Sequence, residues 1–187
     1  METPFSEQLA DVIRGRRSIN LFEPDAIDDA AITEAVEVAR WAPNHGLTQP
    51  WTFYLLGPKT AARFVDLGAE MEAIAKGERA GELRRQRLQA IPGSFVLTSQ
   101  RNRDELIDSE NYAACCCAAQ NLMLYLWARG IGTKWTTGAI TRDARFLELI
   151  GAHPEQERVV GHFWYGRPKL VATQRRRDAA SLLRRLP

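Results

Sequence analysis

Two short runs of the sequence carry cationic and hydroxyl groups at a spacing that suits the binding of a phosphate. Arg16, Arg17 and Ser18 are consecutive and follow a segment with the pattern of an amphipathic helix. Two guanidinium groups and a hydroxyl can donate several charge-assisted hydrogen bonds to phosphate oxygens. The second run, Arg175 to Arg177, stands near the end of the chain. Surface arginines and a solvated tail are the competing interpretations, and these residues alone do not separate the alternatives.

The common catalytic and metal-binding patterns do not occur in the sequence. GIGTK at 130–134 lacks the third glycine of a dinucleotide-binding fingerprint and the spacing of a Walker loop, and no serine stands in a G-x-S-x-G turn. The histidines His45, His153 and His162 are isolated. Residues Cys115 to Cys117 point about 100° apart on a helix, so we expect buried small side chains there. We therefore expect no metal site and no catalytic side chain, and a bound cofactor would supply any redox chemistry.

Composition indicates one globular domain over residues 1–187. Its 45% hydrophobic and 26% charged residues are ordinary values for such a domain, and the net charge is only +2. The tail at 173–187 is basic, with five arginines against one aspartate. A nucleic-acid binder using this tail is a possible reading, but no aromatic residues are interleaved with the arginines. We expect neither nucleic acid nor a membrane as partner, and a cytoplasmic location, since no signal-peptide pattern or disulfide framework is present.

The stretch from Asn111 to Gly138 is the expected centre of the fold. Its part from Tyr112 to Trp127 is apolar apart from Gln120 and Asn121, so it predicts a long helix that is buried on every side. The first half of this helix is made of small residues, which let other backbones approach closely.

The remaining elements mix helices and strands without a regular βαβ alternation. This pattern favours an α+β layered domain over a doubly wound sheet. Thr3 is the expected N-cap of the first helix and Asp28 that of the second. The helical and strongly charged segment 59–89 is expected to break at its glycines, and its charge run favours a solvated surface or lid. Expected helices lie at 4–15, 28–42, 59–89, 112–127 and 141–150, and expected strands at 51–56, at 95–99, within 130–138 directly after the central helix, and at 158–166.

Four motifs together resemble the nitroreductase family of FMN flavoproteins, in particular its short, compact members. They are RRSI from Arg16, APNHGLTQPWTFYLL from Ala42, KWTTGAIT from Lys134 and VVGHFWYGRP from Val159, and they span most of the chain in the same order as in the family. The resemblance implies an α+β fold with a central mixed sheet flanked by helices, and an obligate homodimer. The long buried helix then lies at the dimer core, and FMN lies in two clefts at the interface.

The resemblance also assigns residues to the cofactor. Arg16, Arg17 and Ser18 match the segment that holds the ribityl phosphate. Trp41 and His45 match positions that reach the flavin from the other subunit, although some relatives have a basic residue in place of Trp41. Trp135, Thr136 and Thr137 match the segment beside the isoalloxazine ring.

The expected function is that of an FMN-dependent oxidoreductase. By this reading NADH or NADPH reduces the flavin, and the flavin then reduces a small acceptor such as a nitroaromatic or a quinone in a two-step mechanism. The alternative is a flavin-binding protein with little turnover that serves in storage, sensing or partner binding, because the fold alone does not specify the activity.

Overall fold

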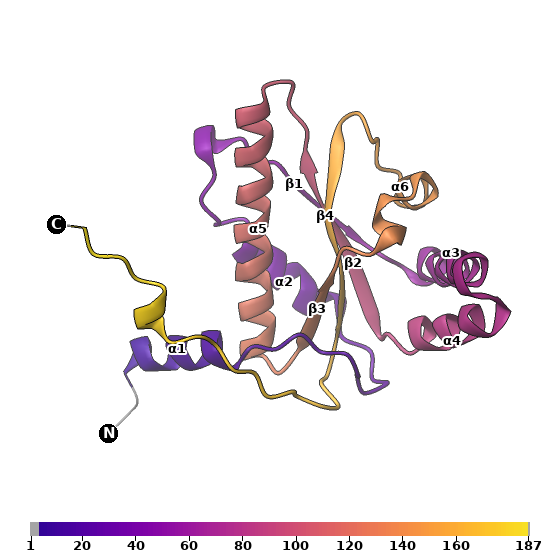
Figure 1. Cartoon of the computed structure of the whole chain (residues 1–187), viewed down its shortest axis with the longest axis horizontal. Coiled ribbons are helices and arrows are strands. Elements are labelled where there is room, and N and C mark those ends of the chain that lie inside the picture. Colours follow the sequence, from indigo (N-terminus) through magenta and orange to yellow (C-terminus); the bar gives the residue numbers. More distant parts are fainter. Residues whose placement is uncertain (1–3, 187) are drawn as a thin grey trace.

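Helices and strands alternate irregularly along the chain, and all strands meet in one sheet (Figure 1). The computed structural model describes residues 4–186, so the expected cap at Thr3 lies outside the described residues. The helices are α1 (Phe5–Gly15), α2 (Asp29–Ala39), α3 (Pro58–Lys76), α4 (Glu78–Gln89), α5 (Glu105–Ala128) and α6 (Ala144–Ile150). The strands are β1 (Trp51–Leu55), β2 (Gly93–Gln100), β3 (Gly132–Thr136) and β4 (Glu157–Gly166), and the short 3-10 turns are η1 (His45–Leu47), η2 (Ala139–Arg142) and η3 (Ala179–Ser181).

The four strands form an antiparallel sheet in the order β1-β2-β4-β3. The sequence predicted a mixed sheet. Within residues 4–186, the parallel pairing is confined to one isolated bridge between Ser18 and Thr133. Long helical connections lie between most of the strands and permit either strand direction, so the local pattern could not decide this point. Strand β3 lies at the edge of the sheet, where the bridge leaves most of its length open.

Helices cover the two faces of the sheet in separate groups. In Figure 1, α2 and α5 lie on one side of the strands, and α3, α4 and α6 lie on the other. Successive side chains of a strand point to opposite faces, and β2 shows this directly. Phe95 and Leu97 pack with α2 and α5, whereas Val96 packs against Phe64 and Phe146 from α3 and α6. Each face of the sheet therefore has its own hydrophobic core, and the predicted α+β class is confirmed.

Helix α5 is longer than predicted and only partly buried within the single chain. It begins at Glu105 because the Asp104 carboxylate accepts hydrogen bonds from the backbone N–H groups of Leu106 and Ile107. The side facing the sheet and α2 is sealed, and its buried residues are Asn111, Ala114, Cys115, Ala118, Ala119, Leu122, Met123 and Leu126. The opposite side leaves Ala113, Cys117 and Gln120 exposed. The expected burial on every side is thus not reached in one chain, and of the three cysteines only Cys115 is buried.

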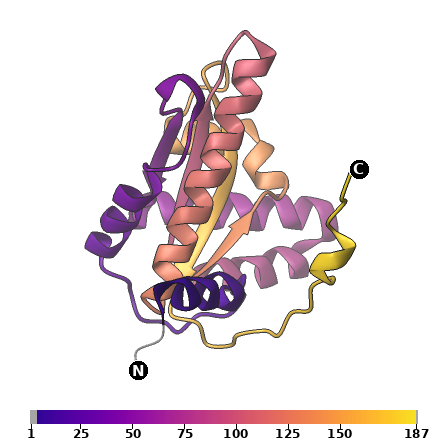
Figure 2. The same ribbon diagram turned by 90° about the vertical axis from the view of Figure 1, so that its left-hand side faces the viewer.

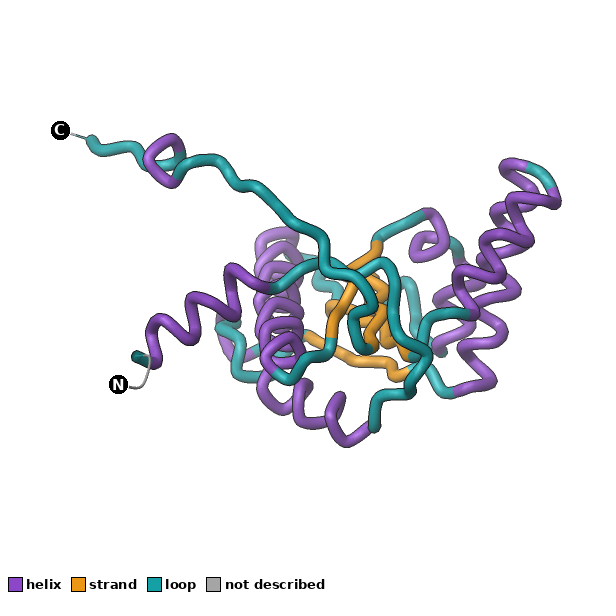
Figure 3. The backbone as a smooth tube through the Cα atoms, turned by 90° about the horizontal axis from the view of Figure 1, so that it is seen from below, coloured by secondary structure: helices purple, strands orange, loops and turns teal. Residues whose placement is uncertain are grey.

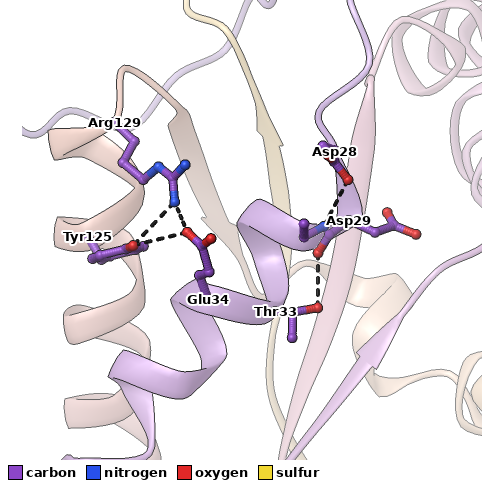
Figure 4. Close-up of polar contacts among 7 residues, drawn as sticks. Asp28, Asp29, Thr33, Glu34, Tyr125 and Arg129 are labelled. Atoms are coloured by element: carbon purple, nitrogen blue, oxygen red, sulfur yellow. Dashed lines mark hydrogen bonds and ion pairs between the residues drawn. The ribbon is translucent and has the colours of Figure 1, made fainter.

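Helix α2 is fixed at its start by a cap and along its length by contacts with α5 (Figure 4). The Asp28 carboxylate accepts a hydrogen bond from the Ala30 N–H at 3.0 Å, which confirms the predicted cap. The Glu34 carboxylate accepts hydrogen bonds from the Tyr125 hydroxyl at 3.2 Å and from the Arg129 guanidinium. These polar contacts join the exposed edges of the two helices, beside the apolar contacts that hold them together.

The segment between β1 and β2 forms two helices that pack side by side. Of the three glycines at which the sequence predicted breaks, only Gly77 ends a helix. Its φ of +91° lies in the region that L side chains rarely adopt. Gly68 and Gly81 lie within α3 and α4, where the two helices approach each other closely. The charged residues that the sequence placed toward the end of segment 59–89 therefore form helix α4.

Candidate functional site

The segment Arg16–Asn20 is held against the open edge of β3 by one buried side chain. Ile19 is fully buried, and its backbone N–H donates to the Thr133 carbonyl at 2.9 Å. Gly132 makes this approach possible, because a Cβ atom there would lie 2.5 Å from Cγ1 of Ile19. The neighbouring Ser18 and Asn20 are exposed on either side of this anchor. The structure thus presents the Ser18 hydroxyl at the protein surface, beside the strand.

Arginine side chains from two distant parts of the chain gather next to this segment. Arg16 and Arg17 are half-buried, and the Arg17 Nε donates to the Ala172 carbonyl at 3.1 Å, which ties the start of the tail to the end of α1. Burial lowers the pKa of Arg16, and the nearby charges of Arg17 and Arg176 lower this pKa further. Within the described residues, none of these arginines forms an ion pair with a carboxylate. We call Arg16, Arg17, Ser18 and Arg176 the first cation cluster; it is suited to a phosphate.

Arg84, Arg87 and Lys134 form a second cation cluster, and two of its members, Arg84 and Lys134, lie over the Trp164 ring. The Arg84 Cζ lies 5.9 Å and the Lys134 Nζ 4.8 Å from the ring centroid. Burial lowers the pKa of Lys134, and Arg87 and Arg84 lower it further. Burial is also the main cause of the lowered pKa of Arg84, followed by the charge of Arg87. None of the three forms an ion pair within residues 4–186.

Asn20 connects the two clusters. Its side-chain oxygen accepts a hydrogen bond from Lys134 Nζ at 2.6 Å, two residues beyond Ser18. From Thr133, beside Ser18, the chain runs along β3 and leaves the strand at Thr137, and four residues of extended chain span about 13 Å. The two clusters therefore lie along one edge, with the Thr136–Thr137 turn at its far end.

Sequence reasoning missed the second cluster. Arg84 and Arg87 stand three residues apart, which places both on one face of a helix, and this spacing was an available signal. The surrounding charges obscured this signal, because the arginines meet Lys134 only in the folded chain, where the Arg84 side chain reaches the Trp164 ring of β4. Arg85, between them, forms an ion pair with Asp66 instead.

The three residues predicted beside a flavin ring lie at the end of β3. The Trp135 indole is half-buried, and its Nε1–H donates to the Val160 carbonyl at 3.0 Å, so packing fixes its position. The Thr136 hydroxyl donates to the His162 carbonyl at 2.8 Å, and Thr137 is exposed. Three groups at the end of β3 therefore remain accessible to a ligand. They are the backbone of residues 136–137, the Thr137 side chain and the exposed part of the Trp135 ring.

Trp41 and His45 are not brought to the other predicted site residues within the chain. Both are exposed, and Trp41 reaches 75% exposure. The Thr48 hydroxyl, just after η1, donates to Asn111 on α5 at 2.8 Å, whereas the end of α1 contacts Trp127. These points on α5 are about 24 Å apart along the helix axis. Figure 2 shows α1 crossing the lower end of α5, with the 41–48 segment at the other end.

His162 has a structural role. It is 1% exposed, and its Nδ1 accepts a hydrogen bond from the Trp164 indole at 3.1 Å. Burial, with a smaller effect of Arg84, lowers its pKa to about 3, so the ring is neutral at physiological pH. Across residues 4–186, no three histidine, cysteine or carboxylate side chains come together as metal ligands. No helix in that range has the length and hydropathy to cross a bilayer.

Comparisons with known proteins point to one family. The family model described as "Nitroreductase family" matches residues 13–167. The chain is 31% identical over 147 residues, 76% of each chain, to "Putative NAD(P)H nitroreductase YfhC" of Bacillus subtilis (strain 168). A nitroreductase-like family protein of Bacillus cereus superimposes with a TM-score of 0.85 at 29% identity, over 100% of this chain and 98% of that one.

A more distant structure shares the fold. A protein of Desulfovibrio desulfuricans, solved in complex with FMN, has a TM-score of 0.77 at 21% identity and covers 100% of this chain and 99% of its own. The family match contains all four sequence motifs except the last residue of the fourth, and it includes the anchored Arg16–Asn20 segment and all of β3 and β4. On these grounds, the chain belongs to the nitroreductase family.

Proposed function

We propose that this protein is an FMN-dependent oxidoreductase that uses NADH or NADPH. The observation that carries the proposal is the pair of cation clusters, joined by Asn20 along the open edge of β3, whose cations form no ion pairs within residues 4–186. Like charges that lower one another's pKa are stabilised when an anion binds between them. The Desulfovibrio desulfuricans structure contains FMN, and the name of the Bacillus subtilis relative specifies NAD(P)H. Both facts support this choice of cofactor and donor.

The first cation cluster fits the phosphate of FMN. Arg16 supplies a half-buried guanidinium, Ser18 an exposed hydroxyl, and Arg176 a second charge from the tail. Arg17 donates to three backbone carbonyls, of Arg14, Arg16 and Ala172. Its role in the proposal is to hold the tail in place so that Arg176 stays near Arg16.

The second cation cluster fits the pyrimidine edge of the flavin ring. FMN supplies hydride acceptance from the nicotinamide donor and electron transfer to a nitroaromatic or quinone acceptor. Lys134, Arg84 and Arg87 would stabilise negative charge on that edge, as preorganised cations do at sites where charge develops. Trp135, Thr136 and Thr137 would position the ring through the turn that ends β3. No protein nucleophile is required.

A homodimer would complete the site, and an exposed apolar surface supports it. Phe5, Leu9 and Ile13 of α1 are 45–78% exposed. A mostly apolar cavity of about 470 Å³ lies between α1 and α5 and is also lined by Leu124 and by Val38 of α2. Contiguous apolar surfaces of this kind mark interaction sites, and a two-fold axis is the commonest way to cover one. In such a dimer, Trp41 and His45 of the partner subunit would approach the flavin.

The oligomeric state can be measured directly. We expect the purified protein to have the mass of a dimer by light scattering and Leu9→Glu to shift it toward the monomer. Leu83→Glu is the matched control, because Leu83 is also exposed but lies on α4. A monomeric wild-type protein, or equal effects of both variants, would contradict the proposed interface.

One absorption experiment tests the function itself. We expect freshly purified protein to show a flavin spectrum at one FMN per chain, and this spectrum to bleach on anaerobic addition of NADPH or NADH. A flavin spectrum that neither nucleotide bleaches would favour the alternative of a flavin-binding protein with little turnover. A colourless protein that does not take up added FMN would overturn the proposal.

A further inference from the structure

A cavity of about 480 Å³ opens next to the turn that ends β3. Thr137 and Arg142 line it on the side of η2, Tyr112 of α5 closes another side, and Arg101 and Arg158 come from the ends of β2 and β4. The cavity therefore begins at a residue that the proposed function places beside the flavin ring. It lies beyond that ring as β3 runs, on the side away from the first cation cluster.

The charges around this cavity are not balanced. Arg158 is compensated, since its Nη1 lies 3.3 Å from an Asp108 carboxylate oxygen and its guanidinium covers the Tyr112 ring at 4.2 Å. Arg101 and Arg142 form no ion pair within the described part of the chain. The Arg101 Nε donates to the Glu157 carbonyl at 3.3 Å, and the Arg142 Nη1 to the Thr137 carbonyl at 3.4 Å. Two guanidinium groups thus keep most of their donors free.

The acidic residue in the lining of the cavity, Glu157, is hydrogen-bonded to two neutral side chains. The Glu157 carboxylate accepts hydrogen bonds from the Tyr54 hydroxyl, at 2.7 Å and 2.9 Å, and from the Thr98 hydroxyl. Burial raises the pKa of Tyr54 to about 12, and the hydrogen bond to Glu157 contributes, so this contact persists at neutral pH. The carboxylate keeps its charge but forms no ion pair with Arg101 or Arg142 in the described part of the chain, so the guanidinium donors of both arginines stay available to a ligand.

Apolar and aromatic side chains line two further walls of the cavity. Ala144 and Leu147 of α6 and Val160 of β4 form one wall, and the Tyr112 ring, fixed by Arg158, forms another. A cavity of this volume is in the range that accepts a small ligand such as one substituted ring. A planar ligand would lie between the apolar wall and Tyr112 with an anionic substituent near Arg101 and Arg142.

We infer that this cavity selects the electron acceptor, and that the preferred acceptor is an aromatic compound with an anionic substituent such as a carboxylate or sulfonate. The inference rests on the proposed function, which places the flavin ring at Thr137. Arg142 is the residue best placed to set the preference, because its hydrogen bond to Thr137 holds its guanidinium at the mouth of the cavity nearest to the ring.

A matched pair of acceptors tests the inference with the flavin-loaded protein. 4-Nitrobenzenesulfonate is anionic, and 4-nitrobenzenesulfonamide has nearly the same shape and is neutral at pH 7. We expect the wild type to have the higher kcat/KM for the sulfonate. We expect Arg142→Gln to lower the sulfonate-to-sulfonamide ratio about tenfold and Arg101→Gln to lower it severalfold. Arg63→Gln, an exposed arginine of α3 outside the cavity, should leave the ratio unchanged.

A binding measurement separates this inference from the proposed function. Calorimetric titration with benzenesulfonate, which cannot be reduced, needs no turnover, and we expect Arg142→Gln to weaken its binding about tenfold. Weaker binding in this variant supports the anion-binding cavity even if the protein proves inactive. An unchanged ratio and unchanged benzenesulfonate affinity would overturn the inference while leaving the flavin chemistry intact. A variant that raises the KM for NADPH in place of the acceptor KM would assign the cavity to the donor and would also overturn it.

Discussion

Two faces of helix α4 carry arginines in opposite situations. Arg85 points to α3 and forms an ion pair with Asp66, and it lies 3.7 Å from Glu82 as well. Arg84 and Arg87 contribute instead to the cluster around Lys134, and neither forms an ion pair within residues 4–186, although the Glu72 carboxylate acts on Arg84 from a distance. Paired surface charges of the first kind contribute little to stability and need no ligand. Partly buried cations that repel one another would be stabilised by an anion bound between them, and this contrast distinguishes the proposed site from the paired charges on α4.

The end of α1 and the residues just after it show the same contrast between paired and unpaired arginines. Arg14 is exposed and lies 3.8 Å from Asp11, whereas Arg16 is half-buried among other arginines. Figure 3 shows the tail crossing the body of the protein and then running outward on the side of α1. Without a bound anion, the order of this tail would depend mainly on backbone contacts such as those of Arg17.

His162 is an ionisable group that is almost fully buried, unlike the exposed and half-buried arginines. It gives the largest expected effect, on the pH dependence of stability. Its folded pKa of about 3 lies below the ordinary value of 6.5, so the unfolded chain binds more protons between these limits. The free energy of unfolding should therefore fall as the pH drops below about 6.5, by up to about 1.4 kcal/mol per pH unit. Urea titrations at pH 6.5 and 4.5 measure this slope. We expect His162→Gln to flatten it and His153→Gln, at an exposed site, to retain it; equal slopes in wild type and His162→Gln would contradict the prediction.

Removing the half-buried cation of the first cluster should weaken the cofactor complex. We expect Arg16→Ala to raise the Kd for FMN roughly thirtyfold, because a charge-assisted hydrogen bond contributes about 2 kcal/mol. Fluorescence titration of the apoprotein measures the Kd, and Arg14→Ala serves as the paired-charge control. If Arg16→Ala purifies with full flavin content and normal turnover, Arg16 has no role in holding the phosphate.

The second cluster should affect the redox properties more than the affinity. We expect Arg84→Gln with Arg87→Gln to shift the two-electron potential of the bound flavin about 30 mV more negative, equivalent to roughly tenfold in the equilibrium constant. Fewer cations near the ring stabilise its reduced, anionic form less well. Spectroelectrochemistry reads the potential directly. Arg85→Gln on the other face of α4 should leave it in place, and an equal shift in that control would remove the distinction between the two faces.

The smallest effect is expected at a paired surface charge. Arg129→Gln removes the ion pair with Glu34, whose partners are 43% and 53% exposed in their side chains. Exposed pairs contribute about 0.2–1 kcal/mol, so we expect a small loss in the free energy of unfolding and normal FMN content. Denaturant titration and the flavin absorbance measure both. A loss of several kcal/mol would show that this contact is required to hold α2 on α5.

Much of the local structure was predictable because its causes lie within a few residues. The carboxylate of Asp28 caps the helix that follows it, Gly77 ends α3, and the apolar run from Tyr112 indicates a central helix. The family was accessible for a similar reason, since four short motifs in the correct order do not require knowledge of packing. The assignment of Arg16, Arg17 and Ser18 to the phosphate remains a prediction, supported by the charges around them.

The sequence by itself determined the elements, the fold class and the family, because these depend on local spacing and on motifs read in order. The tertiary structure alone decided which distant charges meet. Arg84 and Arg87 come near Lys134 only when α3 and α4 fold onto the sheet, and Arg176 comes near Arg16 only when the tail returns to α1. The sequence also did not reveal that one side of α5 is exposed, because an apolar pattern does not specify which neighbour covers each face of a helix. Electrostatic interaction depends on distance through space, and no local pattern records that distance.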